Sequence, residues 1–409
     1  METTSSRSPA ALNRAAVTLT CLGLLTACAP KWQRSTLVDP RAVAQALGDP
    51  WDVDAAPFDP AKLPSFDPPS KLRPCCAFGH DLKVQLGELP IPLVRVPNIV
   101  APDDLGPHRY GAGAVAGEHN GLVYTCRGGF IDIAHVRDNA DRALYLTLEI
   151  ARALPDGVTV TMPHEGTDRT VVVAPLPAKL LASHGRWHIA AALAAHANHQ
   201  LSNWHEIITW YGFQSTPGVS ERMSAFSPED IYSNTLGTRL AVGIVLNKEM
   251  RSRDEYDVAL QAWMLEALRR LGAVSKEDAA AATTAVDGLW WDSKQRVPEF
   301  KLVTRRFLDT QLPVTPWLVE SVRPDDPGLQ AMCADQPPTL PLTLPDRLGS
   351  HKIADLVSVR FEFNKWTPES FPVAAKQGDI VTPADFPKIL DAIREAGTRE
   401  LGPDFDKPK

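Results

Sequence analysis

The pattern of apolar and polar residues predicts a chain with a mainly helical centre. Residues 128–153 and 185–211 predict two long helices, and the second of them ends at Gly212, a residue typical of a C-cap. The segment Ser227-Pro228-Glu229-Asp230 predicts a helix start, with serine as N-cap and an acid at the third position. Further helices are predicted at 227–250, 254–271, 276–289 and 382–397.

Short strands are predicted around these helices. Residues 357–363 alternate strictly between apolar and polar side chains, which is typical of a half-buried strand. Segments 158–162 and 170–174 predict a hairpin, and an apolar strand is predicted at 122–125. Residues 82–100 also alternate but contain prolines, which favours edge strands. The predicted fold class is therefore α+β, with small antiparallel sheets around the helical centre.

The N-terminus predicts export. Arg7 and Arg14 precede a short apolar stretch, and Leu25-Thr26-Ala27-Cys28 then has the form of a lipobox. The apolar stretch is shorter than the ~20 residues of a transmembrane helix. We therefore expect residues 1–28 to be a lipoprotein signal peptide with lipidation at Cys28, and an ordinary secretory signal is the alternative.

Residue 29 bears on the location of the expected lipoprotein. Acyl chains on Cys28 would hold the mature chain firmly on a membrane. Because Ala29 rather than aspartate follows the cysteine, we expect sorting to the outer membrane, with the protein facing the periplasm or the cell surface. The lipid anchor makes the membrane the first expected partner.

Composition changes near residue 70. Prolines are dense between residues 29 and 70, which predicts a semi-extended tether, with one short helix possible at 40–47. Residues 71–409 are expected to form a single large α+β domain, since 44% apolar and 22% charged residues are ordinary globular values. The net charge of −7 gives no reason to expect a nucleic acid as partner.

Four cysteines remain after export and lipidation: Cys75, Cys76, Cys126 and Cys333. An exported chain meets an oxidising compartment, where disulfides persist. Cys75 and Cys76 are adjacent and can scarcely pair with each other, so one of them could reach Cys333. The connectivity cannot be derived from the sequence and stays open.

Cys126 is a candidate nucleophile. It stands where the predicted strand 122–125 gives way to the predicted helix 128–153. The pKa of a thiol falls at a helix N-terminus, because the positive end of the helix dipole stabilises the thiolate. A buried or disulfide-bonded cysteine is the alternative interpretation.

The two long helices carry candidate metal ligands. Asp132, His135 and Asp138 follow one another at steps of three, and His199 and Glu206 share one face of the second helix. If the helices pack antiparallel, His135, Asp138, His199 and Glu206 could bind a divalent metal such as zinc. A buried network whose charges neutralise one another is the alternative.

Three segments carry a resemblance to a known family: Tyr124–Asp138, Trp204–Gly212 and Ser224–Asn234. In these segments the chain resembles a family of bacterial lipoproteins of unknown function. The resemblance implies a location in the cell envelope and implies nothing about chemistry.

Two functions follow from these observations. The first is a lipid-anchored hydrolase or acyl transferase with Cys126, His135, Asp138, His199 and Glu206 as catalytic residues in a pocket between the helices. The second is a non-enzymatic structural or binding lipoprotein of the envelope. An open cleft lined by Cys126, His135, His199 and Glu206 would favour the enzyme. A buried Cys126 far from every histidine, with Asp138 paired to an arginine, would favour the second function.

Overall fold

The structure is a computed structural model, in which the described residues are 38–49, 51, 59–62, 65–73, 78–79, 81–86, 89–112, 117–214, 221–294, 303–365, 367, 371–372 and 376–409. The predicted signal peptide, Cys28, Cys75 and Cys76 lie outside the described residues. Residues from Val38 to the C-terminus form one compact unit.

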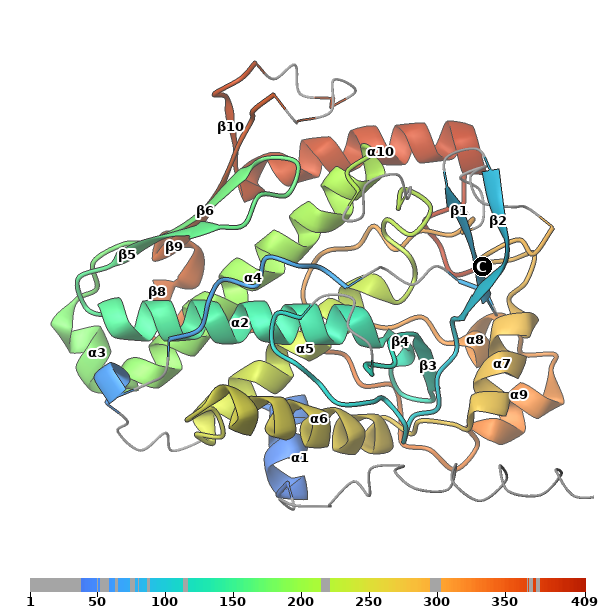
Figure 1. Ribbon diagram of the computed structural model, residues 1–409, viewed down its shortest axis with the longest axis horizontal. Helices are drawn as coiled ribbons and strands as arrows, with labels where there is room; N and C mark the ends of the chain where they lie inside the picture. Colours follow the sequence, from blue (N-terminus) through green and yellow to red (C-terminus); the bar gives the residue numbers. More distant parts are fainter. Residues whose placement is uncertain are drawn as a thin grey trace, which may run out of the picture. The chain divides into compact units, whose positions relative to one another are not determined.

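Helix α2 (Ile133–Ala153) is the central element of this unit (Figure 1). It packs against α4 (Arg186–Trp210) and α5 (Asp230–Leu246). Every residue of α5 is buried, which is typical of a helix enclosed on all sides. At Gly237 a Cβ atom would lie 2.1 Å from the carbonyl oxygen of Val136, so the close crossing of α5 and α2 requires glycine.

The remaining helices surround this centre. Helices α1 (Pro40–Gly48) and α6 (Arg253–Arg270) pack against α5, and α7 (Lys276–Ala285) contacts the short strand β3 (Leu122–Thr125). The other helices of the described part are α3 (Ala178–His184), α8 (Val319–Val322), α9 (Pro327–Met332) and α10 (Phe386–Leu401), with short 3-10 turns at Pro60–Lys62, Ile353–Asp355 and Pro383–Asp385.

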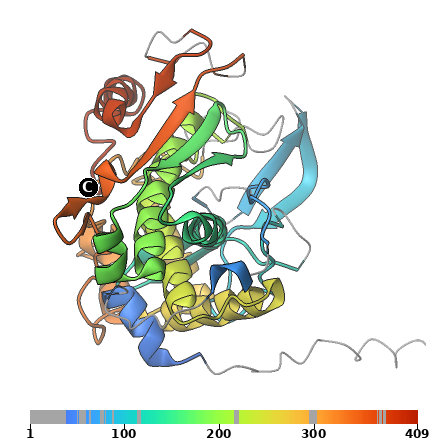
Figure 2. The same ribbon diagram turned by 90° about the vertical axis from the view of Figure 1, so that its left-hand side faces the viewer.

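A four-stranded antiparallel sheet lies beside the helices, as Figure 2 shows from the side. Its strands, in spatial order, are β10 (Ile380–Val381), β9 (Val357–Glu362), β6 (Asp168–Val173) and β5 (Val158–Met162). Buried and exposed residues alternate along β9, as its sequence predicts. The ring of Trp204 on α4 stacks on Phe361 of β9 at 4.2 Å between ring centroids, so this pair joins helix and sheet.

Three two-stranded antiparallel sheets complete the described structure. They are β1 (Asp81–Leu86) with β2 (Leu89–Pro97), β3 (Leu122–Thr125) with β4 (Gly129–Asp132), and β7 (Arg347–Leu348) with β8 (His351–Lys352). The predicted α+β class, with small antiparallel sheets around a helical centre, is confirmed.

Some element boundaries differ from the sequence-based predictions for identifiable reasons. The helix predicted at 128–153 begins at Ile133, because residues 129–132 pair with β3 as strand β4. Helix α5 begins at Asp230 rather than 227. The Ser227 hydroxyl donates to Glu229 at 2.7 Å instead of accepting from the Asp230 N–H, so the predicted capping box is not formed, although the Ser227 N–H donates to Asp230 at 2.7 Å. Helix α10 passes Gly397, where a Cβ would lie 2.3 Å from the Phe405 ring.

Part of the predicted tether belongs to the folded unit. A helix was expected at 40–47, and α1 occupies this place with Val43, Ala46 and Leu47 buried against the core. The buried guanidinium of Arg239 on α5 donates to the carbonyl oxygens of Ala46 and Gly48, at 2.8 and 2.7 Å. The compact unit therefore starts at Val38 rather than at 71.

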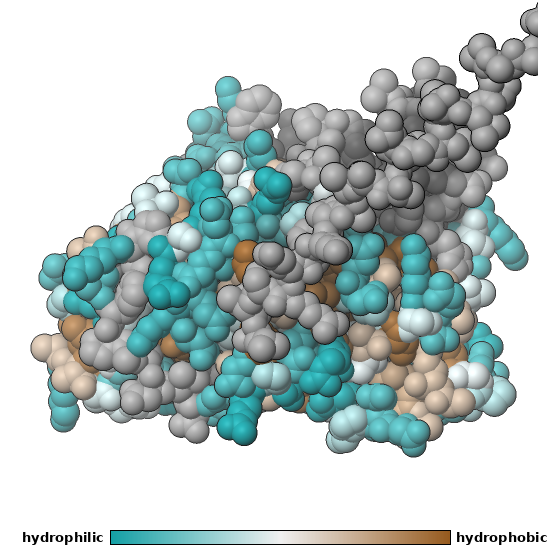
Figure 3. All heavy atoms as spheres, turned by 60° about the horizontal axis from the view of Figure 1, so that its bottom comes forward, coloured by the Kyte–Doolittle hydropathy of each residue, from teal (hydrophilic) through white to brown (hydrophobic). Residues whose placement is uncertain are grey.

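Among the coloured residues in Figure 3, hydrophilic side chains cover most of the visible surface, and hydrophobic ones gather mainly at the lower right of the view. Among the described residues the exposed large hydrophobic side chains are Val258, Leu289 and Ile380. No described helix combines the length and the apolar composition that a membrane crossing requires.

Candidate metal centre and adjoining pocket

Cys126 lies in the turn of a hairpin and not at the start of a helix. Strands β3 and β4 pair from Leu122 with Asp132 to Thr125 with Gly129, so Cys126 falls in the loop between them. Gly129 has a φ of 66°, and a Cβ there would lie 2.3 Å from the carbonyl oxygen of Trp317. The chain therefore turns sharply here, and Cys126 does not receive the stabilisation expected at a helix N-terminus.

Cys126 forms a disulfide with Cys333, which directly follows α9. The Cα atoms are 5.4 Å apart, a usual separation for a disulfide. Because a sulfur in a disulfide cannot act as a thiolate, the predicted nucleophile is absent from the oxidised protein. The suggested pairing of Cys333 with Cys75 or Cys76 is replaced by this bond.

Asp138 forms an ion pair with Arg73. The Oδ1 atom of Asp138 accepts from Nη1 of Arg73 at 2.6 Å, and Oδ2 accepts from the Arg73 backbone N–H at 2.9 Å. The same guanidinium donates from Nε to Glu118 at 2.6 Å and lies 3.2 Å from Asp141. The structure therefore places Asp138 in an ion-pair network with Arg73, and the groups of described residues that could share one metal ion do not include it.

His199 lies apart from the other predicted ligands. Its Nε2 atom lies 2.9 Å from the carbonyl oxygen of Thr310, so this nitrogen carries the hydrogen. Burial lowers the pKa of His199 to about 4, and the ring is neutral at pH 7. The groups of described residues that could share one metal ion do not include His199.

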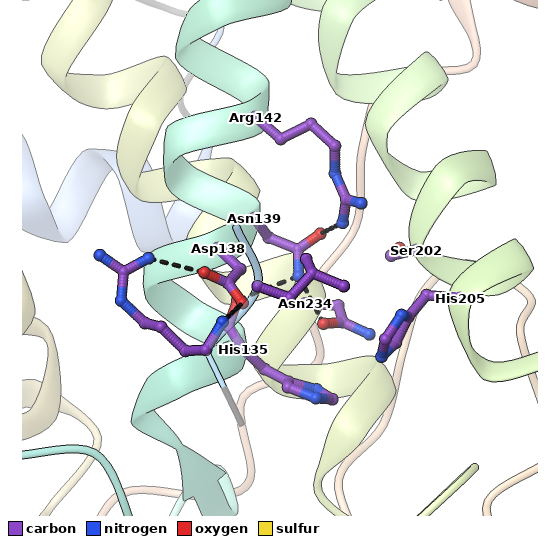
Figure 4. A pocket seen from close by; sticks show the side chains of 9 residues that line it. His135, Asp138, Asn139, Arg142, Ser202, His205 and Asn234 are labelled. Carbon is purple, nitrogen blue, oxygen red and sulfur yellow. Dashed lines mark hydrogen bonds and ion pairs between the residues drawn. The ribbon is translucent and has the colours of Figure 1, made fainter. Parts of the chain in front are cut away.

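His135, His205 and Glu206 come together between α2 and α4. All three are buried, and a ligand atom of each lies within 4.8 Å of the others. His135 stands in the first turn of α2, and the other two lie near the end of α4. The two imidazole rings are 5.9 Å apart and point into a common space (Figure 4). Two histidines and one glutamate form a known ligand set of catalytic zinc sites.

His205 is oriented by Glu165, from the turn between β5 and β6. One carboxylate oxygen of Glu165 accepts from Nδ1 of His205, and the other pairs with Arg169. A histidine that donates from Nδ1 to a carboxylate presents Nε2 to a metal. Burial lowers the pKa of His205, so the ring is neutral at pH 7 and suited to ligation.

Glu206 is also fixed in place. Its Oε2 atom accepts from the backbone N–H of Phe226 at 2.9 Å, and Nδ2 of Asn234 lies 3.4 Å from Oε1. A second group, Asp132 with His135 and Asp230, also lies within 4.8 Å. Asp132 is the N-cap of α2, however, and Oδ1 accepts from the N–H groups of Ala134 and His135. The His135, His205 and Glu206 group is therefore the stronger candidate.

Two further carboxyl groups, Glu229 and Asp230, border the cluster. Oδ1 of Asp230 lies 3.4 Å from Nδ1 of His135. Burial, together with the neighbouring carboxylates, raises the pKa of both acids well above the usual range. Oε1 of Glu229 and Oδ1 of Asp230 have no hydrogen-bond partner within the described part of the chain. A divalent cation would stabilise the ionised forms of this acidic cluster, which is the electrostatic reason to expect one.

A pocket adjoins the cluster between α2 and α4 (Figure 4). Its lining includes His135 and His205, so two of the three candidate ligands meet the pocket. Cys126, His199 and Glu206 are not among the residues that line it. The full lining is Leu72, Arg73, His135, Asp138, Asn139, Arg142, Ser202, His205 and Asn234.

Several of these residues were missed by the sequence analysis. Asn139 and Arg142 lie one helical step beyond His135 and Asp138, and this spacing is a signal that could have identified them. His205 directly precedes Glu206 in a histidine-rich segment, which is a weaker signal. Glu165 belongs to a hairpin turn 40 residues before His205, and no spacing in the sequence connects the two.

Comparison with known proteins identifies the family of the chain. No curated protein and no solved structure matches the chain. A family model described as "Protein of unknown function (DUF4056)" matches residues 63–320, which is well over half of the chain. This segment contains His135, Glu165, His205, Glu206 and Asp230. The chain therefore belongs to the DUF4056 family.

Proposed function

We propose that this protein is a lipid-anchored hydrolase of the cell envelope with a divalent metal, such as zinc, bound by His135, His205 and Glu206. The observation that carries the proposal is the geometry of this group. Its ligand atoms lie within 4.8 Å of one another, and two of the residues line a pocket. Catalytic zinc sites differ from structural sites in having three protein ligands and one open position.

The chemistry follows from these positions. A zinc ion bound here would supply a water molecule with a pKa of about 7 as the nucleophile. Asp230, beside His135, has a raised pKa because of burial and neighbouring carboxylates. A carboxyl group with a raised pKa is suited to hold a proton and to release it during a reaction. Glu165 would act as a positioning residue, since it holds the ring of His205.

The location in the envelope is part of the same proposal. The lipobox at residues 25–28 supports a lipid anchor on Cys28, and the DUF4056 family would then include lipoproteins. The disulfide between Cys126 and Cys333 agrees with an oxidising compartment outside the cytoplasm.

A non-enzymatic structural or binding lipoprotein is the second candidate function. It is favoured by the disulfide of Cys126 and by the ion pair of Asp138 with Arg73, which give two predicted catalytic residues structural roles. Because no free thiol is left at Cys126, acyl transfer through this residue is not proposed further.

The test is a measurement of zinc affinity on the purified full chain, first stripped of metal. We expect one zinc ion to bind, His205→Ala to abolish binding, and Glu165→Gln to weaken it roughly 10- to 100-fold. His199→Ala is the matched control, since it removes a buried histidine of the same helix that lies outside the cluster. Absence of zinc binding, or equal losses in His199→Ala and His205→Ala, would overturn the metal centre.

Hydrolysis is tested separately with a panel of amide and ester substrates. Turnover that is lost with His205→Ala and restored by zinc in the stripped wild-type chain supports the enzyme. A chain that binds zinc at this site but hydrolyses none of the substrates with or without it favours the second function.

A further inference from the structure

Arg142 is a buried cation whose guanidinium borders the pocket. The residue is 5% exposed and lies two turns after His135 on α2. Its Nε donates to Oδ1 of Asn198 at 2.6 Å, and Nη2 donates to Oδ1 of Asn139 at 2.8 Å. Within the described part of the chain, Nη1 has no hydrogen-bond acceptor and Arg142 has no ion pair. Figure 4 shows the guanidinium in the space between α2 and α4.

Neutral amides hold this guanidinium in place. Nδ2 of Asn198 donates to Oγ1 of Thr238 at 2.7 Å, and Nδ2 of Asn139 donates to Oδ1 of Asn234 at 2.5 Å. These contacts fix the orientation of Arg142 without neutralising its charge. Arg73, the other arginine of the pocket wall, contrasts with it, because Glu118, Asp138 and Asp141 surround that guanidinium.

The charge of Arg142 persists at neutral pH. Burial lowers its pKa to about 10, and Asp138 and Glu206 act against this effect from a distance. A buried charge without a partner is costly, so a positioned cation with an open donor is suited to receive an anion. Arginine is the residue that binds planar oxyanions best, because its donors form a rigid fork.

We propose that Arg142 binds a carboxylate group of the substrate inside the pocket and so positions the scissile bond beside His135 and His205. This inference rests on the proposed metal-dependent hydrolysis and names the substrate class, a small amide or ester that bears a free carboxylate. A carboxylate is favoured over a phosphate because one guanidinium balances one negative charge. The buried side chain of Glu206, which also acts on Arg142, would repel a dianion more strongly than a monoanion.

The experiment titrates acetate and, separately, inorganic phosphate into the full chain by calorimetry, with and without zinc. We expect acetate to bind in both states and to bind more tightly than phosphate. Arg142→Met should weaken acetate binding at least about tenfold, because it removes a charged hydrogen bond, and should leave zinc content unchanged. Arg152→Met is the control, because this half-buried arginine in the last turn of the same helix pairs with Glu149 and does not line the pocket, and it should bind acetate as the wild type does.

A second variant, Arg142→Lys, is needed in case Arg142→Met does not fold. Arg142→Lys keeps the charge but lacks the fork, so it should also bind acetate more weakly than the wild type. Circular dichroism shows which variants are folded. The inference is overturned if the wild type binds no acetate, if a folded Arg142 variant binds it unchanged, or if phosphate binds more tightly.

The measurements with and without zinc distinguish the carboxylate subsite from the metal centre. Acetate binding that depends on Arg142 in a chain that binds no zinc would refute the metal centre and retain the carboxylate subsite. Zinc binding together with acetate binding that is independent of Arg142 would retain the metal centre and refute the carboxylate subsite.

Discussion

Acid should destabilise the metal-free protein through His199. This histidine is buried on α4, with Nε2 bonded to the carbonyl oxygen of Thr310 at 2.9 Å. Its pKa in the folded protein is about 4 because of burial, against 6.5 for an ordinary histidine. As the pH falls from 6.5 to 4, the unfolded chain takes up a proton at this position and the folded chain does not.

The magnitude follows from the difference between the two pKa values. Each pKa unit corresponds to about 1.4 kcal/mol, so the difference costs about 3 kcal/mol of unfolding free energy at pH 4. Because the pKa of His199 is lower in the folded than in the unfolded chain, its contribution to the unfolding free energy is fully present above pH 6.5. This contribution is lost as the pH falls from 6.5 to 4. His199→Gln should reduce the loss of unfolding free energy between pH 6.5 and pH 4 by about 3 kcal/mol, since glutamine can donate to Thr310 but does not titrate.

The assay is urea denaturation of chelator-treated protein at several pH values between 4 and 7.5. The wild type and His199→Gln are compared, so contributions of other histidines cancel in the difference. His351→Gln is the control, because His351 is exposed on β8 and should leave the slope unchanged. If His199→Gln keeps the full pH dependence of the wild type, the argument from burial is refuted.

Two further predictions concern the cysteines. The disulfide closes a loop of 207 residues, so Cys126→Ser with Cys333→Ser should lower the unfolding free energy by about 5 kcal/mol in a chain-entropy estimate. Urea denaturation measures the loss, and a change below about 1 kcal/mol would contradict the estimate. Cys28→Ala should release the protein from membrane fractions or block its maturation, and retention after a carbonate wash would show that the anchor lies elsewhere.

Much of the fold could be predicted because its elements have local signals. The alternation of residues 357–363 and the glycine after α4 lie where the structure has a strand and a helix end. The start of α2 could not be predicted, because Gly128-Gly129 suits a helix start and a hairpin equally well. The hairpin brings Gly129 close to the carbonyl oxygen of Trp317, a residue of a distant segment, and this contact has no local signal in the sequence.

The candidate site could be predicted only in part. His135 and Glu206 are brought together, as helical spacing and antiparallel packing suggested. The sequence could not show whether His199 or His205 joins the candidate metal cluster, because α4 is buried on nearly every side and its sequence has no distinct polar face. The role of Glu165 depends on how the β5–β6 hairpin packs against α4, and that contact has no local signal.

The bond between Cys126 and Cys333 turns the middle of the chain into a covalent ring. His135, Glu165, His205, Glu206 and Asp230 all lie between the two cysteines. A single protease cut between residues 126 and 333 therefore leaves the two fragments joined, and the cluster can stay assembled around its packed core. On a denaturing gel, such a cut would become visible only after reduction of this disulfide.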